Sequence, residues 1–199
     1  EYTLPGSRFK ADDQPNPVDP YGISKYEAEQ ALAKLARDTG MEIVIIRPPL
    51  VYGPGVKANF LSMLDWVDKG IPLPFGAIGN QRSLVAIDNL VSLIITCIDH
   101  PAAANQTFLV SDNEDVSTTQ LLRTLSKALG KPSRLLPFPE SLLKLAAWVF
   151  GRRAVAQRIC SSLQVDISKS CQLLGWTPPT TMDKAMRQVA AYYQEKQTK

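Results

Sequence analysis

Residues 20–49, PYGISKYEAEQALAKLARDTGMEIVIIRPP, contain the pattern that decides the fold. Five residues recur at spacings of four, three, four and three, which predicts a helix over residues 21–38: Tyr21, Lys25, Ala28, Leu32 and Leu35. Gly40 then ends the helix. The apolar run 43–46 does not alternate with polar residues, as is typical of a strand covered on both faces, and two prolines follow it. Helix, strand and breaker in this order indicate an α/β protein.

The rest of the chain predicts one more strand, over residues 106–110, and several helices. A helix over 60–67 ends at Gly70, and one over 91–98 begins with Asp88 as its N-cap. Ser117 opens a capping box before a helix that ends at Gly130. Further helices are predicted near 141–150, 167–174 and 182–196. Because helices dominate after Pro49, we expect a strand-poor region beside the end of a parallel sheet.

Composition narrows the class of protein. The 199 residues include 22 Lys and Arg against 19 Asp and Glu, and the formal charge of +3 is too weak to indicate nucleic-acid binding. Hydrophobic residues make up 45%, which is typical of a globular protein with a packed core. No apolar run reaches the length of a transmembrane helix. The three scattered cysteines argue against a disulfide framework and a metal site and favour a reducing cytoplasm, and the single His100 argues against a Ser-His-Asp triad.

Tyr21 and Lys25 are the first candidates for chemistry. Residues four apart on a helix share a face, so the phenol and the ammonium can point into one cleft. A free tyrosine has a pKa of about 10, and lowering it by roughly 3 units requires about 4 kcal/mol of differential stabilisation, which a fixed cation can supply. Tyrosine then acts as a proton shuttle. A Tyr-x-x-x-Lys pattern also arises by chance, in which case the ring is half-buried and the lysine merely exposed.

The surrounding sequence resembles a known family. PYGxSK at residues 20–25 is followed by RPPLVYGPG at residues 47–55, and this combination resembles the extended short-chain dehydrogenase/reductases, in the NAD-dependent epimerase/dehydratase branch that acts on nucleotide sugars. The resemblance continues through Asn59-Phe60 and through residues 79–90 and 166–178. It implies NAD as cofactor, with NADP not excluded, a nucleotide-sugar substrate and a homodimer.

The resemblance also implies roles for individual residues. Tyr21 would be the catalytic acid/base, and Lys25 its partner and a ligand of the nicotinamide ribose. The nicotinamide side of the cleft would be lined by three residues after the predicted strand, where ligands of open α/β sheets bind: Pro48, Leu50 and Val51. The sugar-nucleotide diphosphate, base and ribose would contact a further set: Asn59, Phe60, Leu73, Phe75, Arg82, Val116 and Arg158. Leu73 and Phe75 would sandwich the base, and the planar guanidinium of Arg82 suits a diphosphate.

Several of these residues have a purely structural alternative. Asn59 could be an N-cap, Phe75 a core residue and Arg82 a solvated surface residue. Residues 142–158 interleave basic and apolar side chains and could contact a membrane or a lipid carrier. We favour the other interpretation, an amphipathic packing helix followed by a basic loop. Leu50 stands where many epimerases of this branch carry asparagine, which argues against a simple galactose-type epimerase.

The glycine-rich turn that cradles the cofactor pyrophosphate in relatives has no counterpart in this sequence. The resemblance therefore predicts the C-terminal part of a Rossmann-like, doubly wound parallel sheet with a smaller, mostly helical substrate-binding lobe. Residues 1–58 would be the remnant of the dinucleotide-binding domain, and 59–199 mainly the substrate lobe, with 84–110 returning to the sheet. We expect these residues to be inactive alone, because relatives place a catalytic Ser or Thr upstream of the tyrosine.

The activity implied for the whole protein is that of a nucleotide-sugar 4-epimerase, in which hydride leaves C4, a 4-keto sugar turns over and hydride returns. Two alternatives stay open. One is a 4-reductase or 4,6-dehydratase of a nucleotide-linked or lipid-linked sugar in surface-polysaccharide biosynthesis. The other is a fragment that only binds nucleotide sugars.

Overall fold

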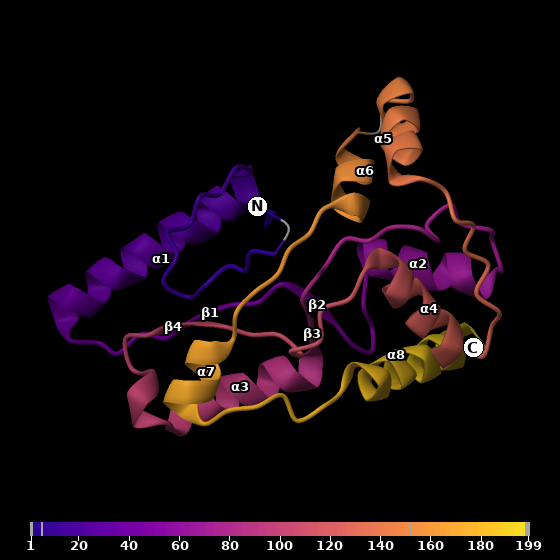
Figure 1. Cartoon of the computed structure of the whole chain (residues 1–199). Coiled ribbons are helices and arrows are strands. Elements are labelled where there is room, and N and C mark those ends of the chain that lie inside the picture. Colours follow the sequence, from indigo (N-terminus) through magenta and orange to yellow (C-terminus); the bar gives the residue numbers. More distant parts are fainter. Residues whose placement is uncertain (1, 5, 152, 198–199) are drawn as a thin grey trace.

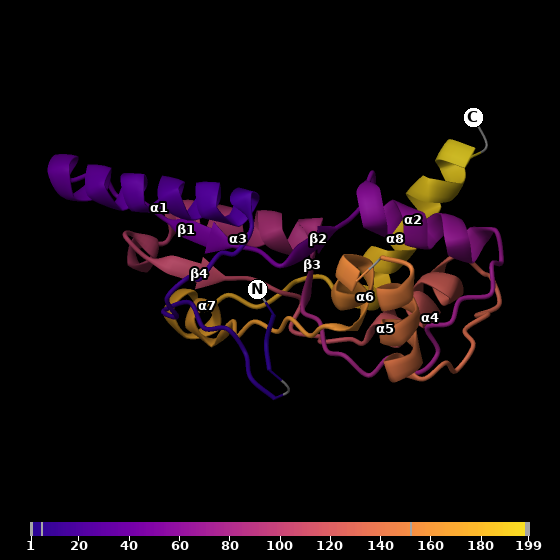
Figure 2. The same cartoon turned by 90° about the horizontal axis from the view of Figure 1, so that it is seen from above.

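The computed structural model describes residues 2–4, 6–151 and 153–197, without the side chains of residues 58, 59, 154 and 155. Figures 1 and 2 show its elements in two orientations. In chain order they are α1 (Pro20–Thr39), β1 (Ile45–Arg47), β2 (Leu50–Tyr52), α2 (Ala58–Asp68), β3 (Leu84–Ala86), α3 (Ile87–Asp99), a 3₁₀ turn (Pro101–Ala103), β4 (Thr107–Leu109), α4 (Thr118–Ala128), α5 (Glu140–Val149), α6 (Arg153–Cys160), α7 (Ser168–Leu174) and α8 (Met182–Gln197).

Helix α1 forms where the sequence predicts it. The Asp19 carboxylate accepts a hydrogen bond of 2.9 Å from the amide of Gly22, so the first turn is capped. Gly40 ends the helix in the left-handed conformation at φ +73°, which glycine adopts without steric cost. None of the residues of α1 is buried, and strand β1 after it is only half-buried. The expectation of a strand fully covered on both faces is therefore wrong for this chain as it stands.

The strands form two parallel pairs. Strand β1 pairs with β4 in the register Ile45 to Thr107, and β2 pairs with β3 in the register Leu50 to Leu84. Helix α3 connects β3 to β4, so residues 84–110 return to the strands formed by residues 45–52. Helices α1 and α7 lie on opposite sides of the β1–β4 pair (Figure 2). Parallel strands covered by helices confirm the α/β prediction.

Two hydrophobic clusters meet at β3. Leu84 and Ala86 pack with α2, α4 and α8, whereas Val85 packs with α3, β4 and α7. Successive side chains of a strand point to opposite faces, so three residues serve both clusters. The division into a domain of residues 1–58 and a lobe of residues 59–199 stays a prediction.

Three local expectations are wrong. The N-cap of α3 is Ala86, and Asp88 lies inside the first turn, where its charge suits the helix dipole. The sequence predicted only two strands, whereas the structure also has β2 and β3, which at three residues each are too short to be recognised from sequence. Residues 153–160, expected as a basic loop, form α6, because Gly151 at φ +66° turns the chain and Ala, Gln and Arg propagate a helix. We call residues 140–160 the α5–α6 hairpin.

Candidate active site

The Tyr21 and Lys25 side chains lie side by side on the first turns of α1. The Lys25 ammonium is 5.4 Å from the centroid of the Tyr21 ring, as the spacing of four predicts. Both side chains are exposed, with 71% of Tyr21 accessible to solvent. The pair is thus held by the helix alone, without packing around the ring.

A cavity of about 340 Å³ begins next to this pair, between α1, the loop of residues 9–19 and the carboxyl end of β1. Lys25 and Pro48 line it, and Tyr21 does not. One wall is a bidentate ion pair in which the Arg47 guanidinium donates to the Glu29 carboxylate at 2.5 to 3.2 Å. This pair ties α1 to the end of β1, which keeps Lys25 close to Pro48.

A second cavity, of about 270 Å³, brings together four of the residues singled out in the sequence: Leu50, Phe75, Arg82 and Arg158. Its remaining walls come from α2, β3, the start of α4 and the end of α6: Ser62, Met63, Trp66, Leu84, Thr118, Leu121, Leu122 and Ile159. We call this cavity the arginine cleft. Two cations set in apolar walls form a site for an anionic group with an apolar neighbour.

Arg82 is held in place by its backbone and its side chain. Its amide and carbonyl pair with Val116 at 2.9 and 3.0 Å, and its guanidinium donates to the carbonyl of Arg158 at 2.6 Å. Burial lowers the pKa of Arg82, and within the described residues no carboxylate forms an ion pair with it. A half-buried cation without a carboxylate partner favours an anionic ligand.

Asn80, which the sequence did not single out, organises the far wall of the arginine cleft. Its amide donates to the carbonyls of Ile159 and Ser161 at 3.1 and 2.9 Å and accepts from the amide of Thr118 at 2.9 Å. The Thr118 hydroxyl also donates to the Ile159 carbonyl at 2.7 Å. These bonds join the start of α4 to the end of α6, and they fix the backbone from which Arg158 projects.

Other predicted residues do not reach the cleft with their side chains. Phe60 is buried and stacks on Tyr52 with ring centroids 5.7 Å apart. Leu73 is buried in the core and pairs with the backbone of Leu135, so it does not face Phe75 across the cleft. Val51 and Val116 are partly buried against the two clusters. Asn59 lies in the first turn of α2, and its side chain is outside the described part of the chain.

A buried polar network supports the strands beneath the cleft. The Asp112 carboxylate accepts hydrogen bonds from the Tyr52 hydroxyl, the Asn89 side chain and the Ala86 amide at 2.7 to 2.8 Å. Burial raises the pKa of both Tyr52 and Asp112. Asn89 also bonds to the backbone of Thr180 before α8. No sequence motif indicated this network, because the residues that each hydrogen bond joins are 23 to 91 positions apart in the sequence.

The described residues hold no group of three or more His, Cys, Asp or Glu side chains that could bind a metal ion. Among the same residues, no helix is long and apolar enough to cross a membrane.

Parallel strands that alternate with helices, with a Tyr-Lys pair beside the carboxyl end of β1, place the chain among the Rossmann-like α/β proteins. A model of the NAD dependent epimerase/dehydratase family matches residues 2–111. The chain belongs to that family.

Individual relatives are similar over most of this chain. A UDP-glucose 4-epimerase of Vibrio cholerae is 56% identical over 191 residues, which is 96% of this chain and 58% of the relative. An N-acetyl-alpha-D-glucosaminyl-diphospho-ditrans,octacis-undecaprenol 4-epimerase of Escherichia coli O157:H7 is 26% identical over 90% of this chain and 59% of its own length. The chain thus spans just under three fifths of these relatives.

Solved structures share the fold. A UDP-glucose 4-epimerase of Thermotoga maritima with UDP-glucose has a TM-score of 0.76 at 20% identity, over 99% of this chain and 60% of that one. A UDP-glucuronic acid 4-epimerase of Bacillus cereus with NAD has the same TM-score and identity, over 98% and 58%.

Proposed function

We propose that the protein carrying this chain is an NAD-dependent 4-epimerase of a nucleotide sugar. The observation that carries the proposal is the arginine cleft, in which the half-buried Arg82 and the exposed Arg158 lie beside Leu50 and Phe75. A diphosphate matches two cations, and an apolar ring such as Phe75 suits a nucleotide base. The Vibrio cholerae relative, named a UDP-glucose 4-epimerase, supports the same activity, and on this ground we propose it despite the argument from Leu50 against a simple galactose-type epimerase.

The residues of this chain fit one end of the cofactor. Lys25 and Pro48 share the cavity beside β1, and an ammonium there can donate to ribose hydroxyls. The pyrophosphate has no cradle at α1, because the Asp19 carboxylate already occupies its N-terminus. NAD, when bound, accepts and returns the hydride. Tyr21 would take the proton from the C4 hydroxyl and return it, and Lys25 would stabilise the phenolate.

A second candidate keeps the 4-epimerase chemistry and exchanges the nucleotide for a lipid carrier. The Escherichia coli relative, whose name specifies a diphospho-undecaprenol sugar, favours it. The apolar surface of the α5–α6 hairpin next to Arg158 also favours it. Either substrate would belong to surface-polysaccharide biosynthesis in the cytoplasm. We also propose that the whole protein is a homodimer.

Calorimetric titration of the chain with UDP-glucose tests the cleft directly. We expect UDP-glucose and UDP to bind, and glucose not to bind, because the diphosphate supplies the charge. Arg82→Gln should weaken UDP-glucose binding by roughly 10- to 100-fold, the worth of a hydrogen bond to a charged group. Arg187→Gln is the matched control, since Arg187 pairs with Asp183 on α8. Equal affinities of the two variants would contradict the proposal.

A further inference from the structure

The α5–α6 hairpin exposes large apolar side chains on a helix that has no buried residue. In Figure 1 the hairpin stands above the rest of the chain, with α5 on its outer side. Leu145, Trp148 and Val149 are 55%, 53% and 64% exposed, and Phe150 at the end of α5 is 76% exposed. Between Leu142 and Phe150 the only charged or polar side chain is Lys144. Exposed apolar patches of this kind mark interaction surfaces.

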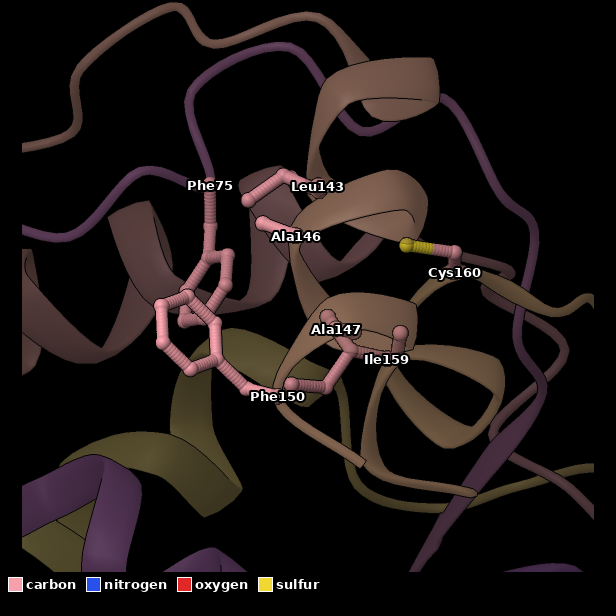
Figure 3. Close-up of a pocket in the computed structure, with 8 residues that line it drawn as sticks. Phe75, Leu143, Ala146, Ala147, Phe150, Ile159 and Cys160 are labelled. Atoms are coloured by element: carbon pink, nitrogen blue, oxygen red, sulfur yellow. The ribbon is translucent and has the colours of Figure 1, made fainter. Parts of the chain in front are cut away.

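Helix α5 is apolar on two faces, and only the inner face has a structural role. Leu143, Ala147 and Phe150 face Phe75 and α6, with which they line a cavity of about 530 Å³ (Figure 3). Their spacing of three and four is that of one helix face, on which Leu143 and Ala147 are half-buried and Phe150, at the end, stays exposed. The outer stripe of Leu142, Leu145 and Val149 repeats the same spacing but is exposed. A second apolar stripe beside the packed one is not needed to hold the helix in place, so we infer that the outer stripe is covered by a partner.

The charges around the hairpin indicate what covers it. Residues 140–160 contain four basic residues and one acidic residue, Glu140, which is paired with Lys144 at 2.6 Å. The Arg153 guanidinium lies 5.2 Å from the ring centroid of Trp148, so a cation sits directly at the apolar surface. Basic residues on an amphipathic segment with exposed Trp and Leu are the pattern of interfacial membrane helices.

Helix α3 provides the contrast. It also exposes an apolar ridge, in which Ile95 and Ile98 are 55% and 77% accessible. Its own charges, however, are Asp88 and Asp99, and it contains no basic residue. An anionic surface would be repelled from α3 and attracted to the hairpin, although the two surfaces are similarly apolar.

We propose that the α5–α6 hairpin docks on an anionic phospholipid bilayer, with the outer stripe of α5 and Trp148 in the headgroup region and Arg153 at the lipid phosphates. The inference is independent of the sugar carrier, because it uses the outer face of α5 and not the arginine cleft. It brings the wall of the cleft that Arg158 and Ile159 of α6 form close to the membrane surface, because that wall belongs to the same hairpin.

The test is sedimentation of the chain with vesicles of equal parts phosphatidylcholine and phosphatidylglycerol, compared with phosphatidylcholine alone. Binding is expected to the anionic vesicles and to fall with added salt. Replacing Leu145→Ser and Trp148→Ser together should weaken it by at least about tenfold, and Arg153→Gln by about fivefold. The control pair, Ile95→Ser with Ile98→Ser on α3, removes apolar side chains that are at least as exposed and should leave binding unchanged.

A second measurement uses the unmodified chain and one conservative variant. Brominated lipids should quench the tryptophan fluorescence of the unmodified chain, and Trp148→Phe should remove that quenching, because Trp176 is buried and Trp66 packs against the core. The proposal is overturned if the chain ignores anionic vesicles, or if the α3 pair matters as much as the hairpin pair. It is also overturned if a longer protein containing this chain no longer binds vesicles, since the hairpin is then covered by protein. UDP-glucose binding, measured in parallel, reports separately on the arginine cleft.

Discussion

The Tyr21–Lys25 pair and the arginine cleft are built in opposite ways. The pair comes from one helix, four residues apart, and the tyrosine ring is 71% exposed. The cleft draws its walls from five elements, and Arg82 is fixed there by bonds to Val116 and Arg158, 34 and 76 residues away in sequence. One half of the site is therefore a local motif on the surface, and the other is a packed cavity.

This difference predicts that the two halves have different roles, one in ligand binding and the other in turnover. A packed cleft in which a backbone carbonyl holds the Arg82 guanidinium is preorganised, so ligand binding loses little conformational entropy there. An exposed phenol on a helix offers a proton but contributes little binding surface. We therefore expect substitutions in the cleft to change affinity and substitutions in the pair to change turnover.

The largest effect is expected from Tyr21→Phe in a longer protein that carries this chain and its upstream part. Loss of the proton shuttle should lower kcat for 4-epimerisation of UDP-glucose by about 100- to 10,000-fold. The affinity for UDP-glucose, measured by titration, should stay within a few-fold, because the cleft is untouched. Tyr192→Phe on α8 is the matched control and should leave both unchanged. Retained turnover in Tyr21→Phe would remove Tyr21 from the mechanism.

The local half of the site was predictable from sequence, and so were the elements that carry it. The spacing of Tyr21 and Lys25, the ending of α1 at Gly40 and the capping box at Ser117 all depend on contacts within a few residues. The capping box forms as expected, with the Ser117 hydroxyl accepting from Gln120 and the Gln120 side chain accepting from Ser117. Periodicity is a reliable signal for such features.

The packed half was only partly predictable. Family resemblance indicated Phe75, Arg82 and Arg158 as one group, and the structure brings them together. It paired Leu73 with Phe75, but Leu73 is buried in the core, while Phe75 only packs against that core and lines the cleft. Asn80 could not be recognised, because its partners lie 38 to 81 residues away.

A smaller effect, on the cleft side of the comparison, is expected from Asn80→Ala. The substitution removes three hydrogen bonds and leaves the Ser161 carbonyl and the Thr118 amide without their partner, whereas the Ile159 carbonyl keeps the Thr118 hydroxyl. The free energy of unfolding in urea denaturation should fall by about 2–4 kcal/mol. UDP-glucose affinity should fall a few-fold, because the segment that carries Arg158 loosens, but less than in Arg82→Gln. Gln81→Ala, at the exposed neighbouring position, is the control. If Asn80→Ala were as stable as this control, the three hydrogen bonds would not hold the cleft wall.

The smallest expected effect is a pH dependence of stability that comes from the network beneath the cleft. Burial raises the pKa of Asp112, beneath the cleft, above the ordinary carboxyl value of about 3.9. Because the folded protein then binds the proton more tightly than the unfolded chain, this contribution to stability is complete below the ordinary pKa and is lost as pH rises through the raised one. Asp112→Asn cannot titrate, so the stability difference between the unmodified chain and this variant should shrink from pH 4 to pH 7. Urea denaturation at both pH values measures this difference, and a gap for Asp112→Asn that widens with pH would mean that the network stabilises the ionised carboxylate instead.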